Sequence, residues 1–455
     1  MTPAQATVVT PRAVVPPVDL SEDDEDIVVA NTAATKPKKK KKKSKSESAI
    51  ATGATLASTP APAAVSNEKF SIPEQDNSVF RRVGNWKADA ESRQSCPPKI
   101  TVRYAPVNEE HEYNNFNSRR TEENAAKDFL MEKDLRDIRM AAEVHRNVRK
   151  YAQSFIRPGM LMIDICQKLE KKSLELVGTT ADLSNYLQFG YGFPTGCSLN
   201  HVAAHYTPNH GDKTVLTAND ICKLDFGIHV NGRIVDSAFT VAFDPIFDPL
   251  IQATQDATNA GLREAGIDVR LGDIGAVIQE TIESFEFIDK TGKAIPIKPC
   301  RNLNGHSIEP YRIHGGQSVP IVKKSDFADD KMIEGVCYAI ETFASTGKGY
   351  VVEDGECSHY MISSDGDSGP LRAKGAKPLL QAIEKQFSSL PFCRRWLDDM
   401  GQTRHLLALK GLVEAGAVND YPPLVDVKGS FTSQMEHTFI LRPTCKEIVS
   451  RGDDY

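Results

Sequence analysis

Long apolar runs are missing from this sequence, and so is a basic start followed by an apolar segment. The first absence predicts that the chain has no transmembrane helix, and the second predicts that it has no secretory signal. The nine cysteines form no CxxC pair and follow no regular spacing. This scatter argues against a disulfide framework and fits a reducing compartment. We therefore expect a cytoplasmic protein that has no membrane partner.

A strong net charge is missing as well. The formal net charge of −6 is small for 455 residues and indicates no partner by itself. Hydrophobic residues make up 40% of the chain and charged residues 25%, which is typical of a globular protein with a folded core. The length is sufficient for several domains, or for one large domain with a tail.

The first 100 residues favour such a tail. They are rich in Ala, Thr, Pro, Ser and charge and have few aromatics, which predicts disorder over residues 1–100. An acidic block, Asp19 and Glu22–Asp26, precedes eight lysines within residues 36–45. The continuous part of this lysine block is a candidate polyanion-binding site and consists of Lys38, Lys39, Lys40, Lys41, Lys42 and Lys43. It could bind RNA on the ribosome surface, an acidic protein or a nuclear import receptor, or it could only confer solubility.

The periodicity of the remaining chain, residues 101–455, predicts an α+β fold. A long helical pattern covers residues 121–156 and ends at Arg157-Pro158-Gly159. Further helices are predicted at 163–176, 246–265 and 271–285, and strands at 221–243, 294–322 and 335–343. The order helix, helix, strand, strand therefore occurs twice, which indicates two similar halves around one sheet.

Residues 358–425 interrupt the strand pattern. They contain three short helical patterns, at 377–388, 392–400 and 403–415, and glycine and prolines break the pattern after them. We interpret this region as a helical insertion between two strands.

Two aspartates lie on one predicted hairpin. Apolar residues alternate on both sides of Asn231-Gly232, a strong signal for a two-residue turn. This turn pairs Asp225 with Ala238 and Gly227 with Asp236, so the two aspartates become diagonal neighbours on one face, about 7–8 Å apart. Two carboxylates this close in an apolar hairpin indicate a shared proton or a bound cation. The alternative is a solvated hairpin with two surface aspartates.

Three further residues complete a potential ligand set. His306 follows an apolar run, and Glu341 and Glu436 are single acids in strand-like segments. A lone glutamate in a strand usually faces solvent, so the case depends on the whole set. Four carboxylates and one imidazole are sufficient to hold two divalent ions that share carboxylates and activate a water. The oxygen-rich set favours Mn²⁺ or Fe²⁺, and Zn²⁺ or Co²⁺ would also fit.

Five segments form a recognisable set: Gly192–Asn200 (GFPTGCSLN), Ala204–Asn209 (AHYTPN), Asp225-Phe-Gly, Asn302–His306 and Arg442–Tyr455. Together these segments resemble those of one family, the eukaryotic type 2 methionine aminopeptidases. The resemblance covers about residues 100–455. It implies a pita-bread (creatinase/aminopeptidase-like) fold, in which outer helices surround a curved antiparallel sheet with a dimetal site in the central cleft. It also implies a helical type 2 insertion, which the pattern places at about 358–425.

The resemblance further implies roles for individual residues. One metal takes Asp225, Asp236 and Glu436, and the other takes Asp236, His306, Glu341 and Glu436. Glu341 accepts the proton of the attacking water. Of His205 and His314, one assists the leaving amine or the substrate amide and the other holds the scissile carbonyl. The methionine pocket is lined by Phe193, Ile313, His359 and Tyr421, with Asn304 nearby.

The sequence alone leaves His205 ambiguous. It forms an HxxxH spacing with His201, but the glutamate of the HExxH zinc motif is missing, so a zinc-binding helix is not expected.

The resemblance implies removal of the initiator methionine from nascent polypeptides by a monomeric enzyme that holds two divalent ions. Two alternatives remain. One is an Xaa-Pro peptidase of the same fold, against which the insertion and the segment Phe193–Gly196 argue. The other is a non-catalytic protein that binds RNA or the ribosome, against which the complete ligand set argues. Binding to the ribosome or to a translation initiation factor remains possible as a second role of the lysine block.

Overall fold

The computed structural model describes residues 101–102, 121–327, 329–364, 368–452 and 454–455. The predicted disordered tail and its lysine block lie outside these ranges, so the limits of the tail and of the catalytic domain stay predictions. Within the described ranges, each helix is too short or too polar to cross a bilayer.

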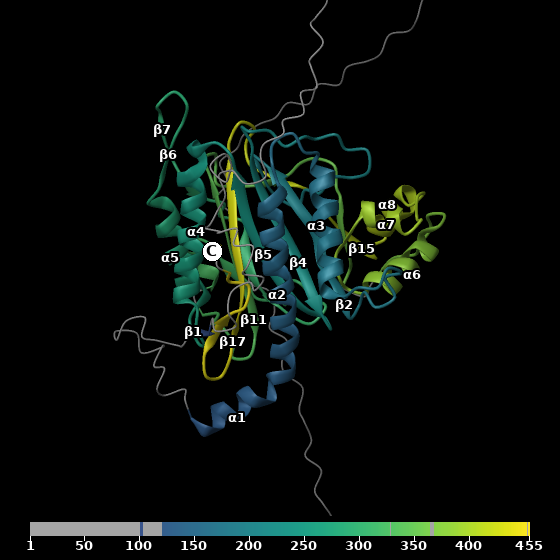
Figure 1. The fold of residues 1–455 in the computed structure, drawn as a ribbon, viewed down its shortest axis with the longest axis horizontal. Helices are drawn as coiled ribbons and strands as arrows, with labels where there is room; N and C mark the ends of the chain where they lie inside the picture. The colour runs from purple at the N-terminus through teal and green to yellow at the C-terminus, as the bar shows by residue number, and fades with distance from the viewer. Residues whose placement is uncertain (1–100, 103–120, 328, 365–367, 453) are drawn as a thin grey trace, which may run out of the picture. The chain divides into compact units, whose positions relative to one another are not determined.

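Helices cover one face of a three-stranded sheet in the first half of the described chain (Figure 1). The sheet has the order β2-β4-β5, and the short strand β3 follows β2. The bounds are Glu122–Leu130 for α1, Glu132–Phe155 for α2, Met162–Val177 for α3, Phe189–Leu199 for β2, Val202–Ala204 for β3, Ile221–Val230 for β4 and Arg233–Ala242 for β5. Apolar side chains of α2, among them Leu135, Ile138 and Val148, are fully buried on this sheet, as the helical pattern predicts.

The prediction of a single helix over residues 121–156 is wrong in one respect. The helix is divided at Met131, whose N–H donates to the carbonyl of Asp128 at 3.1 Å and so closes α1 with a tight turn. Thr121 is the N-cap of α1: its hydroxyl accepts from the N–H of Asn124 at 3.1 Å.

The predicted hairpin is confirmed. Strands β4 and β5 pair antiparallel, with Val230 opposite Arg233 at the turn. Asn231 and Gly232 both have positive φ values, 50° and 79°, which a two-residue turn of type I′ requires. The turn therefore fixes the register of both strands, and with it the faces that their aspartates occupy.

Two helices cover the larger sheet of the second half. This sheet is antiparallel, with the order β1-β18-β17-β11-β9-β10, and β8 pairs with β11. The principal bounds are Asp248–Glu264 for α4, Leu271–Glu283 for α5, Thr101–Val102 for β1, Lys298–Pro299 for β8, Asn304–Ile308 for β9, Ser318–Pro320 for β10, Cys337–Ser345 for β11, Thr432–Leu441 for β17 and Lys446–Ile448 for β18. The smaller elements are η2 (Pro245–Phe247), η3 (Ser325–Phe327), β6 (Glu286–Ile288) and β7 (Ala294–Pro296).

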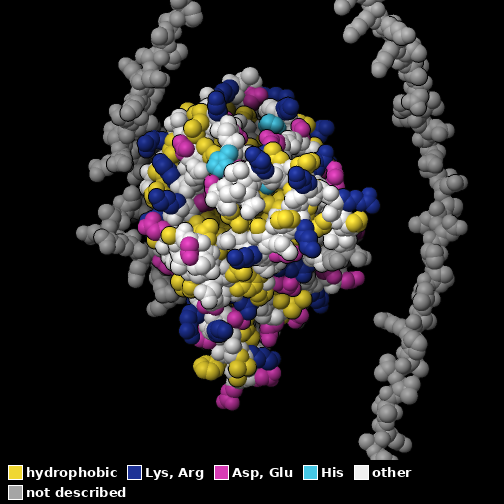
Figure 2. Space-filling view, turned by 90° about the vertical axis from the view of Figure 1, so that its right-hand side faces the viewer, with side chains coloured by type: hydrophobic (Ala, Val, Ile, Leu, Met, Phe, Trp, Pro, Cys, Tyr) yellow, Lys and Arg dark blue, Asp and Glu magenta, His cyan; other side chains and the backbone are white. Residues whose placement is uncertain are grey.

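Three helices occupy the predicted insertion and confirm the helical patterns there. They are α6 (Ala376–Phe387), α7 (Arg394–Asp399) and α8 (Leu406–Glu414). Short strands accompany them: β12 (Val352–Glu353), β13 (His359–Ile362), β14 (Phe392–Cys393), β15 (Val418–Tyr421) and β16 (Leu424–Val425). Figure 2 faces this side of the molecule and shows hydrophobic side chains interspersed with basic and acidic ones.

The two sheets meet along β5 and β17, which belong to different sheets. Side-chain hydroxyls join them. The hydroxyl of Thr438 accepts from the N–H of Asp236 at 2.8 Å and donates to its carbonyl at 2.6 Å. Thr240 makes the same pair of bonds with Gln434, at 2.7 and 2.9 Å. We call this junction the hydroxyl seam and define it by Ser237, Thr240 and Thr438.

Candidate metal centre

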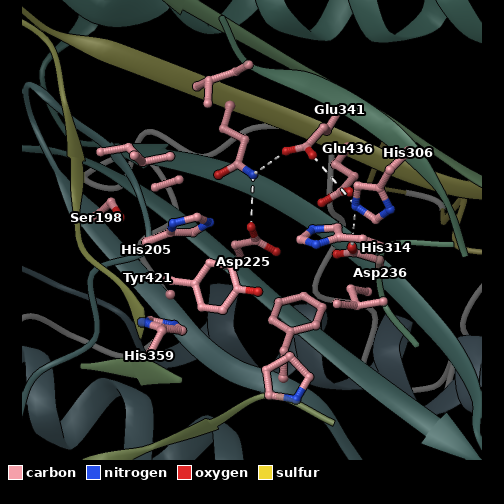
Figure 3. A pocket seen from close by; sticks show the side chains of 18 of the residues that line it. Ser198, His205, Asp225, Asp236, His306, His314, Glu341, His359, Tyr421 and Glu436 are labelled. Atoms are coloured by element: carbon pink, nitrogen blue, oxygen red, sulfur yellow. Dashed lines mark hydrogen bonds and ion pairs between the residues drawn. The ribbon is translucent and has the colours of Figure 1, made fainter. Parts of the chain in front are cut away.

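One pocket of about 260 Å³ gathers the whole predicted site (Figure 3). It lies where the hairpin, the larger sheet and the strands of the insertion region meet. Its lining includes every predicted ligand, catalytic residue and substrate-binding residue: Phe193, His205, Asp225, Asp236, Asn304, His306, Ile313, His314, Glu341, His359, Tyr421 and Glu436. The six lysines of the predicted polyanion site lie outside the described residues.

The hairpin brings Asp225 and Asp236 to one face, as predicted. Asp225 lies opposite Ala238, and Gly227 lies opposite Asp236. Asp236 is 4% exposed. Among the described residues, Oδ1 of each aspartate is buried and has no hydrogen-bond partner. Buried carboxylate oxygens without a partner are costly, so this pair needs a proton or a cation.

The larger sheet supplies a second pair of carboxylates. Glu341 of β11 and Glu436 of β17 are direct cross-strand partners. Like charges at such positions repel each other. Glu436 is 1% exposed, and within the described part of the chain neither of its carboxylate oxygens has a hydrogen-bond partner.

His306 of β9 presents a nitrogen to these acids. Its Nδ1 lies 3.2 Å from the carbonyl of Ser307, which favours a proton on Nδ1 and leaves the lone pair on Nε2. Nε2 lies 3.5 Å from Oδ2 of Asp236 and 3.7 Å from Oε1 of Glu341. A neutral imidazole in this orientation can hold a metal ion through Nε2.

Burial dominates the electrostatics of the four acids. It raises the pKa of Asp225 to about 8, with a further contribution from the charge of Asp236, and it raises the pKa of Asp236 to about 7. Burial and then the neighbouring carboxylates raise the pKa values of Glu341 and Glu436 well above the usual range. Without a cation, these groups therefore retain protons near neutral pH.

The donor set fits a divalent cation. One ligand atom each from Asp236, His306 and Glu436 lies within 4.8 Å of the other two. All three residues are buried. Oxygen donors with one imidazole are the ligands that divalent transition metals accept in proteins.

Two further histidines, His205 and His314, line the same pocket. The rings of His314 and His306 lie 4.6 Å apart at 84°. Burial and then the positive charge of a protonated His314 lower the pKa of His205 to about 4, and burial and then His306 lower that of His314 to about 3. Both imidazoles are therefore neutral at pH 7.

His205 lies outside the helices and has a φ of 64°. A positive φ is strained for a residue with a side chain, and such strain concentrates at functional sites. His201 and His205 flank strand β3, so no helix joins them, in agreement with the sequence analysis. His205 approaches the rings of Tyr421 and His359, at centroid distances of 5.8 and 6.1 Å.

Gln434 is a site residue that the sequence analysis missed. Its Nε2 donates to Oδ2 of Asp225 at 2.9 Å and to Oε2 of Glu341 at 3.5 Å. It therefore links the hairpin acid to the acid of β11. Its position two residues before Glu436 on one strand could have revealed it, because residues i and i+2 share a face.

Comparisons with known proteins show which family this chain resembles. The model of metallopeptidase family M24 matches residues 136–366. The chain is 55% identical over 371 residues to methionine aminopeptidase 2-1 of Neosartorya fischeri. This alignment covers 80% of the present chain and 83% of the relative. It is 54% identical over 371 residues to methionine aminopeptidase 2A of Arabidopsis thaliana, and this alignment covers 80% of the present chain and 82% of the relative.

A solved structure supports the fold. The structure of a thermophilic Arx1 has a TM-score of 0.58 and 17% identity, and the match covers 69% of this chain and 90% of that chain. Together with the family match, this similarity confirms the predicted pita-bread fold. Because the curated relatives share more than half of their aligned residues with this chain and most of their length, the chain belongs to metallopeptidase family M24 and, within it, to the type 2 methionine aminopeptidases.

Proposed function

We propose that this chain removes the initiator methionine from nascent proteins that have a small second residue. The observation that carries this proposal is the cluster of four carboxylates and one imidazole at one end of a partly apolar pocket, in a chain of this family. The comparisons favour this function over the Xaa-Pro peptidase and the non-catalytic alternative, since the similar curated relatives are methionine aminopeptidases.

Two divalent ions are the proposed cofactors. Asp225, Asp236 and Glu436 would hold one, and Asp236, His306, Glu341 and Glu436 the other. The ions supply Lewis acidity that activates water near neutral pH and polarises the scissile carbonyl. Manganese, iron, cobalt and zinc all fit such a donor set.

Glu341 is the proposed general base. Its carboxylate lies beside His306 and opposite Glu436, so it faces the space where the attacking water would bind. Burial and the nearby acids raise its pKa, so the Glu341 carboxylate is a stronger proton acceptor than an exposed glutamate once it is ionised.

His205 and His314 are proposed to handle the substrate amide. Neutral at pH 7, each can donate one hydrogen bond. One would hold the scissile carbonyl and the other would assist the leaving amine. The unblocked amine of the substrate would bind near Asp225.

The methionine side chain is proposed to lie against Phe193, Ile313, His359 and Tyr421, with Asn304 nearby. His359 and Tyr421 are direct cross-strand partners in β13 and β15, within the predicted insertion. Burial, and then a protonated His205, lower the pKa of His359 to about 3, so it stays neutral and suits an uncharged ligand. The insertion therefore shapes the specificity pocket in this proposal.

The direct test is release of free methionine from Met-Ala-Ser and Met-Val-Ser peptides, measured by mass spectrometry. The purified chain would be assayed with Mn²⁺, with Co²⁺ and with a chelator, beside an Ala-Pro peptide. We expect metal-dependent release of methionine and no cleavage of Ala-Pro. Cleavage of the Ala-Pro peptide alone would show that the chain is an Xaa-Pro peptidase. No cleavage of any peptide with any metal would refute peptidase activity.

The variant Glu341→Gln tests the proposed general base, because it keeps the shape of the side chain and removes its charge. Methionine release should fall by at least about 10²-fold, the usual contribution of a general base. Glu353→Gln, on an exposed position of β12, is the matched control and should retain parental activity. Parental activity in Glu341→Gln would contradict the assignment of Glu341.

The lysine block supports a second proposal, on location and partners. We expect Lys38–Lys43 to bind the ribosome or a translation initiation factor, and a monomer that acts in the cytoplasm on chains as they emerge. Deletion of residues 1–50 should weaken cosedimentation with ribosomes at low salt while methionine release from short peptides stays at the parental rate. Unchanged cosedimentation would remove this proposal.

A further inference from the structure

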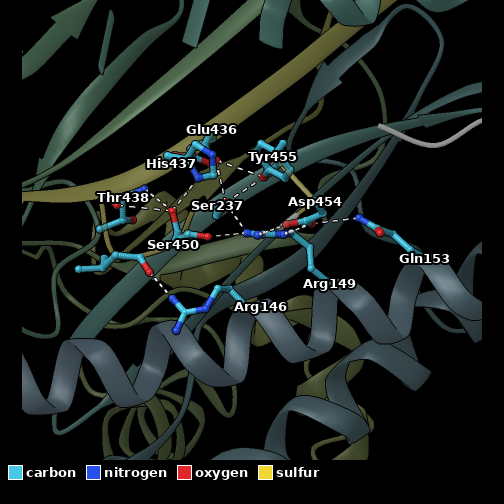
Figure 4. Close-up of polar contacts among 12 residues, drawn as sticks. Arg146, Arg149, Gln153, Ser237, Glu436, His437, Thr438, Ser450, Asp454 and Tyr455 are labelled. Carbon is cyan, nitrogen blue, oxygen red and sulfur yellow. Dashed lines mark hydrogen bonds and ion pairs between the residues drawn. The ribbon is translucent and has the colours of Figure 1, made fainter. Parts of the chain in front are cut away.

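Asp454 and Tyr455 lie beside the strands that carry Asp236 and Glu436, on the side away from the pocket (Figure 4). They occupy the side of the sheet that α2 covers, whereas the acids face the pocket. This region contains polar groups that are buried, and the proposed chemistry gives them no role.

Asp454 is fixed to α2 by a buried ion pair. Nε and Nη2 of Arg149 each donate to its carboxylate at 2.6 Å, and Nε2 of Gln153 donates at 3.0 Å. The side chains of Arg149 and Asp454 are 0% and 1% exposed. A bidentate pair of this kind holds its partners in one geometry.

Tyr455 is held between charged and aromatic neighbours. The guanidinium carbon of Arg149 lies 4.6 Å from the centre of its ring, and the ring of His437 lies 4.4 Å away at 27°. His437 is fixed in turn by the hydroxyl of Ser450, 2.8 Å from its Nδ1. The phenol therefore has little freedom to move.

The phenol hydroxyl reaches both strands of the hydroxyl seam. It donates to the carbonyl of Ala238 in β5 at 2.6 Å and lies 3.3 Å from the carbonyl of Glu436 in β17. It also lies 3.1 Å from the hydroxyl of Ser237, which donates to the carbonyl of Glu436 at 2.7 Å. These contacts involve the backbone of Glu436 itself and both residues that follow Asp236.

We propose that Tyr455, anchored through Asp454 and Arg149, is a positioning residue for the metal ligands Asp236 and Glu436. The inference rests on the proposed function, because it takes these two acids as shared ligands. At the seam, β5 and β17 are joined by a few hydrogen bonds of side-chain hydroxyls, whereas strands within one sheet are joined by backbone hydrogen bonds. Loss of one contact therefore changes the separation of β5 and β17 more readily than it would within a sheet.

Metal binding is sensitive to such a change. Ligand atoms must lie about 2.0–2.2 Å from a transition metal, and supporting groups keep a site within about 0.5 Å of its working geometry. Removal of groups that orient ligands costs roughly 10–100-fold in metal affinity. Tyr455 should therefore affect metal affinity although it contacts no metal and no substrate.

The test compares two Tyr→Phe variants in metal-free protein titrated with Mn²⁺ or Co²⁺ alone in a calorimeter. Tyr455→Phe removes the phenol hydroxyl that contacts both strands of the seam. Tyr338→Phe is the matched control: Tyr338 is buried, whereas Tyr455 is partly buried, and the Tyr338 hydroxyl accepts from the N–H of Ile333 at 2.9 Å and donates to Oε1 of Gln317 at 2.5 Å, away from the seam. Ser237→Ala removes a seam hydroxyl and serves if Tyr455→Phe does not fold.

We expect Tyr455→Phe and Ser237→Ala to bind metal at least about 10-fold more weakly than the parent, and Tyr338→Phe to bind it with parental affinity. Methionine release by the seam variants should recover when metal is in excess. Parental affinity in both seam variants, or an equal loss in Tyr338→Phe, would overturn the positioning role. A parent chain that binds no divalent metal would instead refute the proposed function.

Discussion

At the scale of single residues, a glycine determines where the wall of the pocket lies. Gly227 of β4 lies opposite Phe193 of β2. A Cβ atom at position 227 would approach Cε1 of Phe193 to 2.4 Å, which is too close for any real contact. The absence of a side chain at position 227 therefore lets the Phe193 ring lie against the strand and form one wall.

Gly227→Ala should displace this ring and distort the methionine pocket. We expect kcat/KM for methionyl peptides to fall roughly 10-fold, because a methylene-sized change in an apolar pocket costs that much. The fall should appear mainly in KM, since Phe193 is proposed to contact the methionine side chain and no reacting atom. Steady-state kinetics on Met-Ala-Ser measures both constants. Gly369→Ala, where the nearest atom lies at 3.6 Å, should behave like the parent, and an equal effect at both positions would contradict this reading.

At the scale of elements, one buried ion pair docks the insertion on the rest of the fold. Nη1 and Nη2 of Arg395 in α7 donate to the two carboxylate oxygens of Glu170 in α3, and Nη2 also reaches the Thr207 hydroxyl at 3.2 Å. Arg395 is fully buried. The hydroxyl of Ser358 lies 3.4 Å from the N–H of Thr207 and 3.1 Å from Nδ1 of His359. The Arg395–Glu170 ion pair therefore lies next to the segments that carry His205 and His359.

Arg395→Met should destabilise the protein by about 3–5 kcal/mol, because it leaves the Glu170 carboxylate buried without its partner. Urea unfolding measures this loss. The double variant Glu170→Leu with Arg395→Met should recover most of it, since a buried ion pair can be replaced by apolar side chains. If the double variant is less stable than Arg395→Met, the ion pair is not the cause.

Local elements and distant contacts differ in how far the sequence predicts them. The hairpin, its register and the diagonal placement of Asp225 and Asp236 follow from a two-residue turn and a period of two, so they were predictable. The break at Met131 was not, because the apolar pattern continues through it. The hydroxyl seam and Tyr455 were missed because they join residues about 200 positions apart, for which the sequence contains no periodic signal.

At the scale of the whole molecule, the four acids of the site link stability to pH and metal. Asp225 and Asp236 have folded-state pKa values of about 8 and about 7, whereas unfolded aspartate has about 3.9. Between these values the folded state binds more protons than the unfolded state. The free energy of unfolding of metal-free protein therefore falls as the pH rises through this window.

Chelated protein should accordingly lose stability from about pH 5 to about pH 8, by about 1.4 kcal/mol per pH unit for each extra proton held. Thermal unfolding with a chelator and with Mn²⁺, across this range, measures the effect. Added Mn²⁺ should stabilise the protein most at the upper end, because ions bind the deprotonated acids. Chelated Asp225→Asn should lose less stability than the parent as the pH rises. Identical slopes in the two proteins would contradict this account.

The short turn at Asn231-Gly232 has a consequence for the order in which the site assembles. Closing a two-residue loop is rapid, so β4 and β5 can pair within microseconds, and they bring Asp225 and Asp236 together early. Glu341 and Glu436 meet only after the 94 residues between them have been closed into a loop, which is slower because loop-closure entropy opposes it. A folding intermediate with the hairpin alone would offer two of the four acids, too few for a complete site. Metal would therefore bind late, and its binding would mark chains that have finished folding.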